Sequence, residues 1–168
     1  MVRFVAVFAA AVAALALAGA AMTAAPAHPL TVSLTVDGNF QTIGCCGVSF
    51  NGDPATVVLP GIGRATLTVG LTSSGPLNFP PNGATFLSVY ITTASGDTLV
   101  IFGSAATGTT SVPLLASGTW SVSPLSTGRF AAATGSGTWS VILTVTESGT
   151  VVHPAEVVLA LAGEITLR

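Results

Sequence analysis

The chain has 168 residues, of which 50% are hydrophobic and only 6% are charged, with no lysine and a formal net charge of −2. This length suits one domain with a sizeable hydrophobic core, and this composition excludes a disordered chain, which requires low hydrophobicity and high net charge. Four arginines and six carboxylates leave no basic face for a phosphate backbone, so we expect no nucleic-acid partner.

The first residues have the pattern of a secretory signal peptide. Arg3 gives a positive start, Phe4 to Leu17 is an apolar run, and Ala18-Gly19-Ala20 is a small-residue cleavage site. We predict a signal peptide within residues 1–27, with cleavage between Ala20 and Ala27, followed by a single domain over residues 28–168. The apolar run is shorter than the roughly 20 residues of a bilayer span. We therefore expect a secreted protein, extracellular or periplasmic, with no stable membrane span after processing.

Alternating side chains predict the first strands. Apolar and polar residues alternate from Leu30 to Asp37, as in a half-buried strand, and Asp37-Gly38-Asn39 is expected to end it. Residues 44–60 are rich in glycine and proline, which predicts a long loop with at most one edge strand. Alternation returns from Arg64 to Thr72, whereas the prolines within residues 73–83 argue against a central strand there.

The segment from residue 84 to residue 106 predicts a β-hairpin. Its first half alternates Leu87, Val89 and Ile91 with Phe86, Ser88 and Tyr90, and Ala94-Ser95-Gly96-Asp97 supplies the loop. The returning Leu99-Val100-Ile101-Phe102 is apolar on both faces. Such a strand is buried from both sides or faces a partner subunit, so a homo-oligomer is a candidate.

A repeated strand follows, because Gly118-Thr119-Trp120-Ser121-Val122 returns as Gly137-Thr138-Trp139-Ser140-Val141. Two matched strands with a short, small-residue connection predict an antiparallel pair with both tryptophans on one face. The last predicted strand runs from Val157 to Leu167, with Leu159, Leu161 and Ile165 on one face and Glu156 and Glu164 on the other.

These segments predict an all-β chain with no helix after the signal peptide. About seven or eight short strands with frequent turn signals fit a closed antiparallel β-barrel or a β-sandwich. Exposed strand edges template aggregation unless charge or proline protects them, and charge is nearly absent here. Closure into a barrel of about eight strands is therefore favoured, and such a barrel is filled by side chains or holds one small ligand.

The connection between the Trp strands carries the most distinctive motif, Thr127-Gly128-Arg129-Phe130-Ala131-Ala132-Ala133-Thr134-Gly135. Gly128 permits a bend, Phe130 is expected to plug the barrel end, the alanines allow a tight turn of helix or a bulge, and Gly135 leads into the next strand. With Arg64-Ala65-Thr66, Ser95-Gly96-Asp97-Thr98-Leu99 and Leu161-Ala162-Gly163-Glu164-Ile165, this motif resembles the allene oxide cyclase and dirigent superfamily of eight-stranded barrels. It is closer still to a set of small secreted bacterial barrels with no assigned activity.

This resemblance implies a barrel whose plant relatives bind small hydrophobic molecules inside and steer cyclisation or coupling with polar lumen residues. None of those polar residues matches a position here, so the resemblance assigns no catalytic residue to this chain.

The adjacent Cys45 and Cys46 lie between two glycines. In an oxidising compartment they could form a strained vicinal disulfide, a link between chains, or two free thiols. With His28 and His153 they could also supply four metal ligands, but the spacing fits no known zinc pattern. We therefore expect a loop disulfide or free thiols, no metal site and no cofactor.

No arrangement of residues predicts catalysis. His153 precedes Pro154 in an expected turn, no G-x-S-x-G elbow occurs, and Glu156 and Glu164 would lie about 26 Å apart along one strand, too far for a glycosidase pair. Arg129 is expected to pair with Glu164 or Glu147 and close the barrel end.

The aromatic residues are the candidates for binding. Trp120 and Trp139 are expected to pack in the core, and a sharper hypothesis has them line a lumen together with Phe86, Phe102 and Tyr90. The sequence thus favours non-enzymatic binding of a small hydrophobic molecule in the barrel. The alternatives are a dirigent-like or cyclase-like isomerase acting in the same lumen, and a structural or self-assembling surface protein. The weakest rival, an outer-membrane barrel, lacks the aromatic residues for two girdles.

Overall fold

The structure is a computed structural model that describes residues 25–43, 47–74, 85–108, 113–145 and 152–167. The expected signal segment up to residue 24, Cys45 with Cys46, and Glu147 lie outside these ranges, so their predictions stay open. The described residues form nine strands and one short 3₁₀ turn. They are β1 (Ala27–Ile43), β2 (Gly47–Gly52), β3 (Ala55–Leu59), β4 (Gly63–Ser74), β5 (Thr85–Thr93), β6 (Thr98–Gly108), β7 (Leu114–Val122), η1 (Gly128–Phe130), β8 (Thr134–Val145) and β9 (Val152–Thr166).

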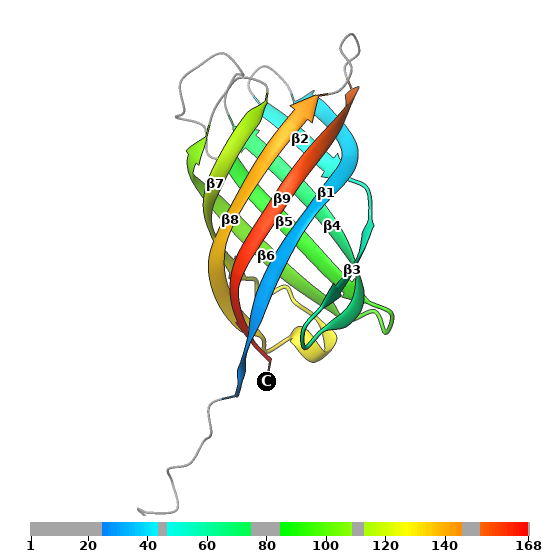
Figure 1. Cartoon of the computed structure of the whole chain (residues 1–168), viewed down its shortest axis with the longest axis vertical. Helices are drawn as coiled ribbons and strands as arrows, with labels where there is room; N and C mark the ends of the chain where they lie inside the picture. Colours follow the sequence, from blue (N-terminus) through cyan, green and yellow to red (C-terminus); the bar gives the residue numbers. More distant parts are fainter. Residues whose placement is uncertain (1–24, 44–46, 75–84, 109–112, 146–151, 168) are drawn as a thin grey trace, which may run out of the picture.

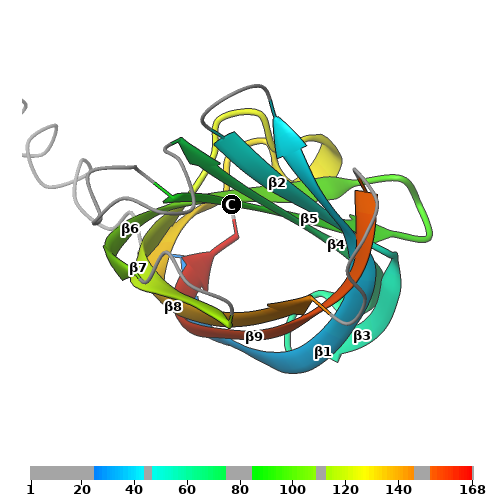
Figure 2. The ribbon, with the colours of Figure 1, turned by 90° about the horizontal axis from the view of Figure 1, so that it is seen from above.

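All nine strands belong to one antiparallel sheet that closes on itself (Figure 1). The order is β2-β1-β9-β8-β7-β6-β5-β4-β3, and β2 pairs with β4 as well as with β1. Eight strands therefore form a closed ring, visible from above in Figure 2, and β3 is a ninth strand paired only with β4 in the described ladders. The predicted all-β barrel is confirmed, and the β-sandwich alternative was wrong because there is a single closed sheet.

The strand predictions were wrong near residue 40. β1 does not end at Gly38 but continues to Ile43, because its second half pairs with β2 on one side and β9 on the other. Residues 47–59, expected to be mainly loop, form β2 and β3 with a break at Asp53-Pro54. The 15-residue β9 also begins before the expected start, so His153 lies in a strand opposite Phe40 and not in a turn.

The barrel wall has one place where neighbouring strands are not paired in a ladder, between β1 and β3, which we call the seam. In the described ladders β1 pairs with β2 only from Gly38 onward, while its residues 27–37 pair with β9 alone. Facing this half of β1 is β3, which pairs with β4 on its other side. Leu34 of β1 and Val57 of β3 are half-buried here and pack against the core. One backbone hydrogen bond lies at the upper end of this seam, where the Asp53 amide donates to the Asp37 carbonyl over 2.7 Å. Below it, no backbone ladder joins β1 to β3 among the described residues, and side chains seal the wall.

The hydrophobic core fills the inside of the ring. Alternate residues of every strand point inward, among them Leu67, Val89, Leu99 and Leu159, each completely buried. The outward positions carry mainly threonine and serine, as on β4, β7 and β8. This inside-out alternation is the period-2 pattern of the sequence, and it makes the barrel a packed body instead of an empty tube.

Candidate functional site

The two tryptophans lie inside the barrel, and each is 2% exposed. The register places Thr119 of β7 opposite Thr138 of β8, one residue before each tryptophan. The indole Nε1 of Trp120 donates to the carbonyl of Thr138 over 3.0 Å, and that of Trp139 donates to the carbonyl of Thr119 over 3.1 Å. The predicted antiparallel pair and the packing of both tryptophans in the core are confirmed.

Glycines make room for the two indoles. A Cβ at Gly163 of β9 would lie 2.5 Å from Cζ2 of Trp120, and a Cβ at Gly103 of β6 would lie 2.5 Å from Nε1 of Trp139. Trp120 therefore leans across β8 toward β9, and Trp139 leans across β7 toward β6. With both rings lying flat on the wall and hydrogen-bonded, they occupy lumen space that a ligand would need.

The other three aromatic candidates lie outside the barrel. Phe86 is 52% exposed, Tyr90 41% and Phe102 40%, while their neighbours Leu87, Val89 and Ile101 are buried. The hypothesis that all five aromatic residues line one lumen is therefore wrong for these three. Successive side chains of a strand point to opposite faces of the sheet. Since Leu87, Val89 and Ile91 point inward, Phe86 and Tyr90 on the same strand must point outward.

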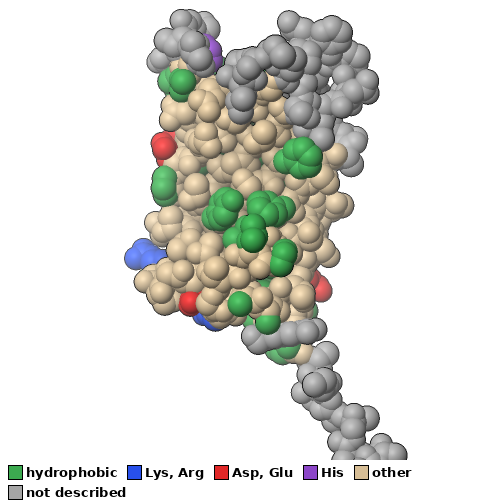
Figure 3. Space-filling view, turned by 180° about the vertical axis from the view of Figure 1, so that it is seen from behind, with side chains coloured by type: hydrophobic (Ala, Val, Ile, Leu, Met, Phe, Trp, Pro, Cys, Tyr) green, Lys and Arg blue, Asp and Glu red, His purple; other side chains and the backbone are tan. Residues whose placement is uncertain are grey.

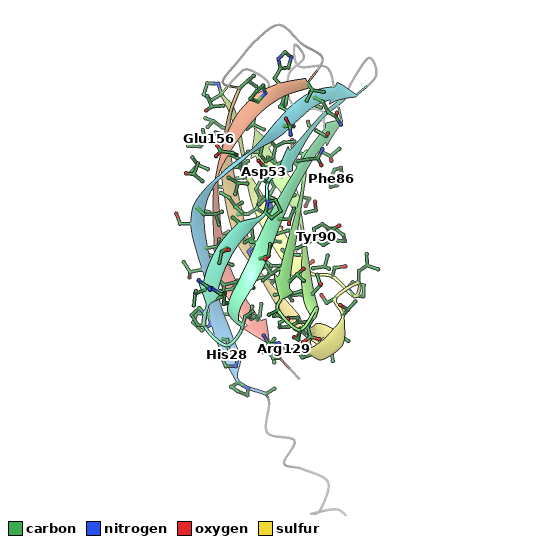
Figure 4. All side chains as sticks on the ribbon, turned by 90° about the vertical axis from the view of Figure 1, so that its right-hand side faces the viewer. His28, Asp53, Phe86, Tyr90, Arg129 and Glu156 are labelled. Carbon is green, nitrogen blue, oxygen red and sulfur yellow. The ribbon has the colours of Figure 1, made fainter. Side chains whose placement is uncertain are left out.

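Phe86, Tyr90 and Phe102 form what we call the aromatic patch. Phe102 of β6 is opposite Ser88 of β5, which lies between Phe86 and Tyr90, so Phe102 is diagonal to both. Diagonal neighbours on one face lie about 7–8 Å apart, within reach of aromatic side chains. Figure 4 shows Phe86 and Tyr90 pointing outward from the same wall, and in Figure 3 hydrophobic side chains gather in the middle of the face formed by β4 to β6.

The floor of the aromatic patch is small and polar. Ser88 is half-buried between the rings, and its hydroxyl donates to the carbonyl of Gly70 on β4 over 3.4 Å. A Cβ at Gly70 would lie 2.6 Å from that hydroxyl, so the glycine keeps the floor low beside Ser88. Strands β5, β6 and β7 contain no Asp, Glu, Lys, Arg or His. These three strands thus present aromatic rings around a hydroxyl floor with no charged side chain of their own.

The covering of Val100 explains why the Leu99 to Phe102 segment of β6 is apolar on both faces. The outward side chain of Val100 is only 3% exposed because the segment from Ser123 to Ser126 covers it. The Ser126 hydroxyl accepts from the Val100 amide over 3.0 Å, and the Ser123 amide donates to the Val100 carbonyl over 2.8 Å. Half of this strand's outer face is therefore covered by the chain itself, which leaves Phe102 in solvent.

The Thr127 to Gly135 motif closes the lower end of the barrel. Phe130 is completely buried in the core cluster, as predicted, and η1 forms at Gly128, whose φ of 58° is readily adopted only by glycine. Arg129 donates to the carbonyl of Ile62 over 2.6 Å, lies 4.8 Å from the Phe130 ring centroid, and forms its ion pair with Asp97 at 4.0 Å. Arg129 thus pairs with Asp97 and not with Glu164 as expected, whereas the alternative pairing with Glu147 stays a prediction because that residue lies outside the described ranges. The expected structural role of Arg129 at the barrel end is confirmed.

The upper part of the core contains a small apolar cavity of about 10 Å³, room for about one water molecule. It is lined by Phe40, Val48, Ser49, Phe50, Leu71, Ser73, Thr85 and Leu143. Drug-sized ligands occupy pockets of about 300–1,000 Å³. The described lining residues therefore leave no room for such a ligand unless they move.

Within the described ranges, no group of three or more His, Cys, Asp or Glu side chains could hold a metal ion. No helix among the described residues is long and apolar enough to cross a bilayer. Comparisons of the chain with protein-family models, with curated proteins and with solved structures found no match. The likeness to the allene oxide cyclase and dirigent superfamily stays a prediction from the sequence.

Proposed function

We propose that this chain is a binding protein that uses the outside of its barrel, through the aromatic patch on β5 and β6. The observation that carries the proposal is the meeting of three half-exposed aromatic rings on two neighbouring strands without charged residues. Large aromatic side chains dominate the energetics of interfaces because each one removes much apolar area from water on contact. The filled barrel then acts as a rigid support for the patch.

This proposal keeps a binding role for the protein but moves it out of the lumen. Trp120 and Trp139 occupy the interior with both ring nitrogens hydrogen-bonded, so a ligand entering there would have to displace them. Breaking such a bond without replacement costs about 1–3 kcal/mol for each buried group. A ligand on the outer wall meets Phe86, Tyr90 and Phe102 with no rearrangement of the core.

Titration with Nile red, a neutral dye whose emission rises in apolar surroundings, tests this placement. We expect the wild-type protein to bind the dye, and the double variant Phe86→Ser/Phe102→Ser to lose about tenfold or more of that affinity. The matched control is Ile142→Ser/Val158→Ser, which removes two side chains, 45% and 39% exposed and opposite one another on β8 and β9. This control should bind as the wild type does.

Thermal melting of both double variants establishes that each is folded. Absence of dye binding would overturn the proposal. Binding that survives Phe86→Ser/Phe102→Ser and quenches the emission of Trp120 and Trp139 would place the dye in the lumen and would overturn it too. Light scattering during gel filtration adds a third outcome. A wild-type dimer that Phe102→Ser converts to a monomer would make the patch a subunit interface and would also overturn the proposal.

A further inference from the structure

The aromatic patch has a shape and chemistry that narrow its ligand, an inference that rests on the function proposed above. We infer that the patch binds neutral carbohydrate, with the C–H faces of sugar rings lying on Phe86, Phe102 and Tyr90. A pyranose ring presents C–H groups on its faces and hydroxyls around its rim. The patch presents the complementary arrangement of aromatic faces and serine or threonine hydroxyls.

The exposed aromatic area of the patch is small. Taking about 200 Å² for a fully exposed aromatic side chain, the three rings together leave about 270 Å² in solvent. A stable protein–protein interface buries about 800 Å² on each partner. The patch falls well short of that area with its apolar part alone, and the strands around it supply hydroxyls. A ligand of a few sugar rings matches this area better than a second copy of the chain does.

The patch has a polar frame. Ser88 lies in its centre, and its oxygen keeps acceptor capacity after donating to Gly70. Outward hydroxyls surround the rings on three sides: Thr68 and Thr72 of β4 opposite Tyr90 and Phe86, Ser104 of β6 opposite Phe86, and Ser121 of β7 opposite Phe102. A purely apolar ligand would cover these groups without hydrogen-bonding them, which is unfavourable. A polyhydroxylated ligand bonds them directly or through water.

No Asp, Glu, Lys, Arg or His occurs in β5, β6 or β7, and the charged residues at the lower end of this face are Asp97, Arg129 and the exposed Arg64 of β4. Sulfated or uronic-acid polymers require several cationic partners, and the strands that carry the three rings offer none. The rings of Phe86 and Tyr90 are four residues apart on one strand, about 13 Å at 3.3 Å per residue. This span suits a chain of sugars lying along the strand more than a single monosaccharide.

Binding to defined polysaccharides tests the inference. The purified protein is tested by pull-down on microcrystalline cellulose and on chitin, and by gel electrophoresis through soluble starch and through mixed-linkage glucan. We expect retention on at least one of these neutral polymers, little affected by raising salt to 1 M because no charge takes part. Tyr90→Ala and Phe102→Ala should each weaken retention about tenfold. Ile142→Ser/Val158→Ser should not.

The results separate this inference from the proposed function. If none of the four polysaccharides retains the wild-type protein while Phe86→Ser/Phe102→Ser still loses the dye, the carbohydrate inference is wrong and the binding patch stands. If Phe86→Ser/Phe102→Ser keeps both dye binding and polysaccharide retention, the binding patch and the carbohydrate inference are both wrong. Retention that Tyr90→Ala and Phe102→Ala leave unchanged, or that 1 M salt abolishes, overturns the carbohydrate inference, because sugar would then bind elsewhere or through charge.

Discussion

Replacing Gly163 by alanine tests how the lumen is filled. The added Cβ would sit 2.5 Å from Cζ2 of Trp120 and closer still to the carbonyl oxygen of Ser136. Carbon atoms in contact prefer about 3.5–4.0 Å, so the indole must retreat by about 1 Å. That movement stretches the 3.0 Å bond from Trp120 Nε1 to Thr138 beyond hydrogen-bonding range.

The expected loss of stability follows from these two effects. Overpacking costs about 1–3 kcal/mol, and an unsatisfied buried N–H about 1–3 kcal/mol. The reduced freedom of the unfolded chain offsets about 0.4–1 kcal/mol. We therefore expect Gly163→Ala to lower the free energy of unfolding by about 1–6 kcal/mol in urea denaturation. In a Trp139→Phe background, the emission of Trp120 should also shift, because its ring moves.

Gly96→Ala is the matched control, since it has the same effect on the unfolded chain. Gly96 has a φ of 87° and nothing within 4 Å of an added Cβ. Only backbone strain remains, which costs about 1–2 kcal/mol. If Gly163→Ala destabilised the protein no more than Gly96→Ala did, or left the emission of Trp120 unchanged, the indole would not lie on Gly163 and the account of the filled lumen would fail.

Two further predictions concern the barrel wall. Glu156 and Asp37 lie directly opposite each other on β9 and β1, and like charges in that position destabilise a sheet. Glu156→Gln should therefore raise the free energy of unfolding, measured in urea, by about 0.2–1 kcal/mol. A free energy of unfolding equal to or below that of the wild type contradicts this pairing. Hydrogen exchange followed by mass spectrometry should show faster exchange in β3, beside the seam, than in β5 and β6, which have neighbours on both sides; equal protection would mean that β1 and β3 are paired in solution.

Local alternation predicted the parts of the fold in which each strand has one apolar face. Trp120 and Trp139 stand between threonine and serine neighbours, so both had to point inward, and the repeated sequence indicated their pairing. Phe130 was recognisable as a plug because it is the one large apolar side chain between Thr127 and Gly135. These features depend on side chains close in sequence, which is why the sequence alone sufficed.

The failures occurred where distant pairing overrides local signals. Asp37-Gly38-Asn39 reads as a turn, but β1 runs straight through it because β2 and β9 hold both of its edges. The Gly52-Asp53-Pro54 sequence reads as part of a loop, yet it only separates β2 from β3. Turn propensity is a weak preference, and a ladder on each side of a strand is enough to overcome it.

The outward position of Phe86 and Tyr90 was present in the sequence, since both alternate with residues assigned to the core. The position of Phe102 was not predictable in this way. Leu99 to Phe102 is apolar on both faces, so its pattern does not indicate which side chains face the core. Only the structure shows that the segment after Ser123 covers Val100 and stops short of Phe102. The aromatic patch therefore could not be assembled from the sequence, which does not reveal which half of a doubly apolar strand its own chain will cover.

The remaining question is whether the fold itself needs aromatic residues on its outer wall. Elsewhere that wall uses threonine and serine, as at Thr68, Thr119 and Ser121, and the sheet forms there equally well. A cross-strand pair involving an aromatic ring contributes about 0.2–1 kcal/mol. Phe102 points outward and does not belong to the core cluster, so its truncation opens no cavity in the core. We expect truncation of Phe102 to lower the free energy of unfolding by no more than about 1 kcal/mol and to weaken ligand binding about tenfold. A large loss of affinity with a small loss of stability distinguishes a binding patch from aromatic residues that only support the sheet.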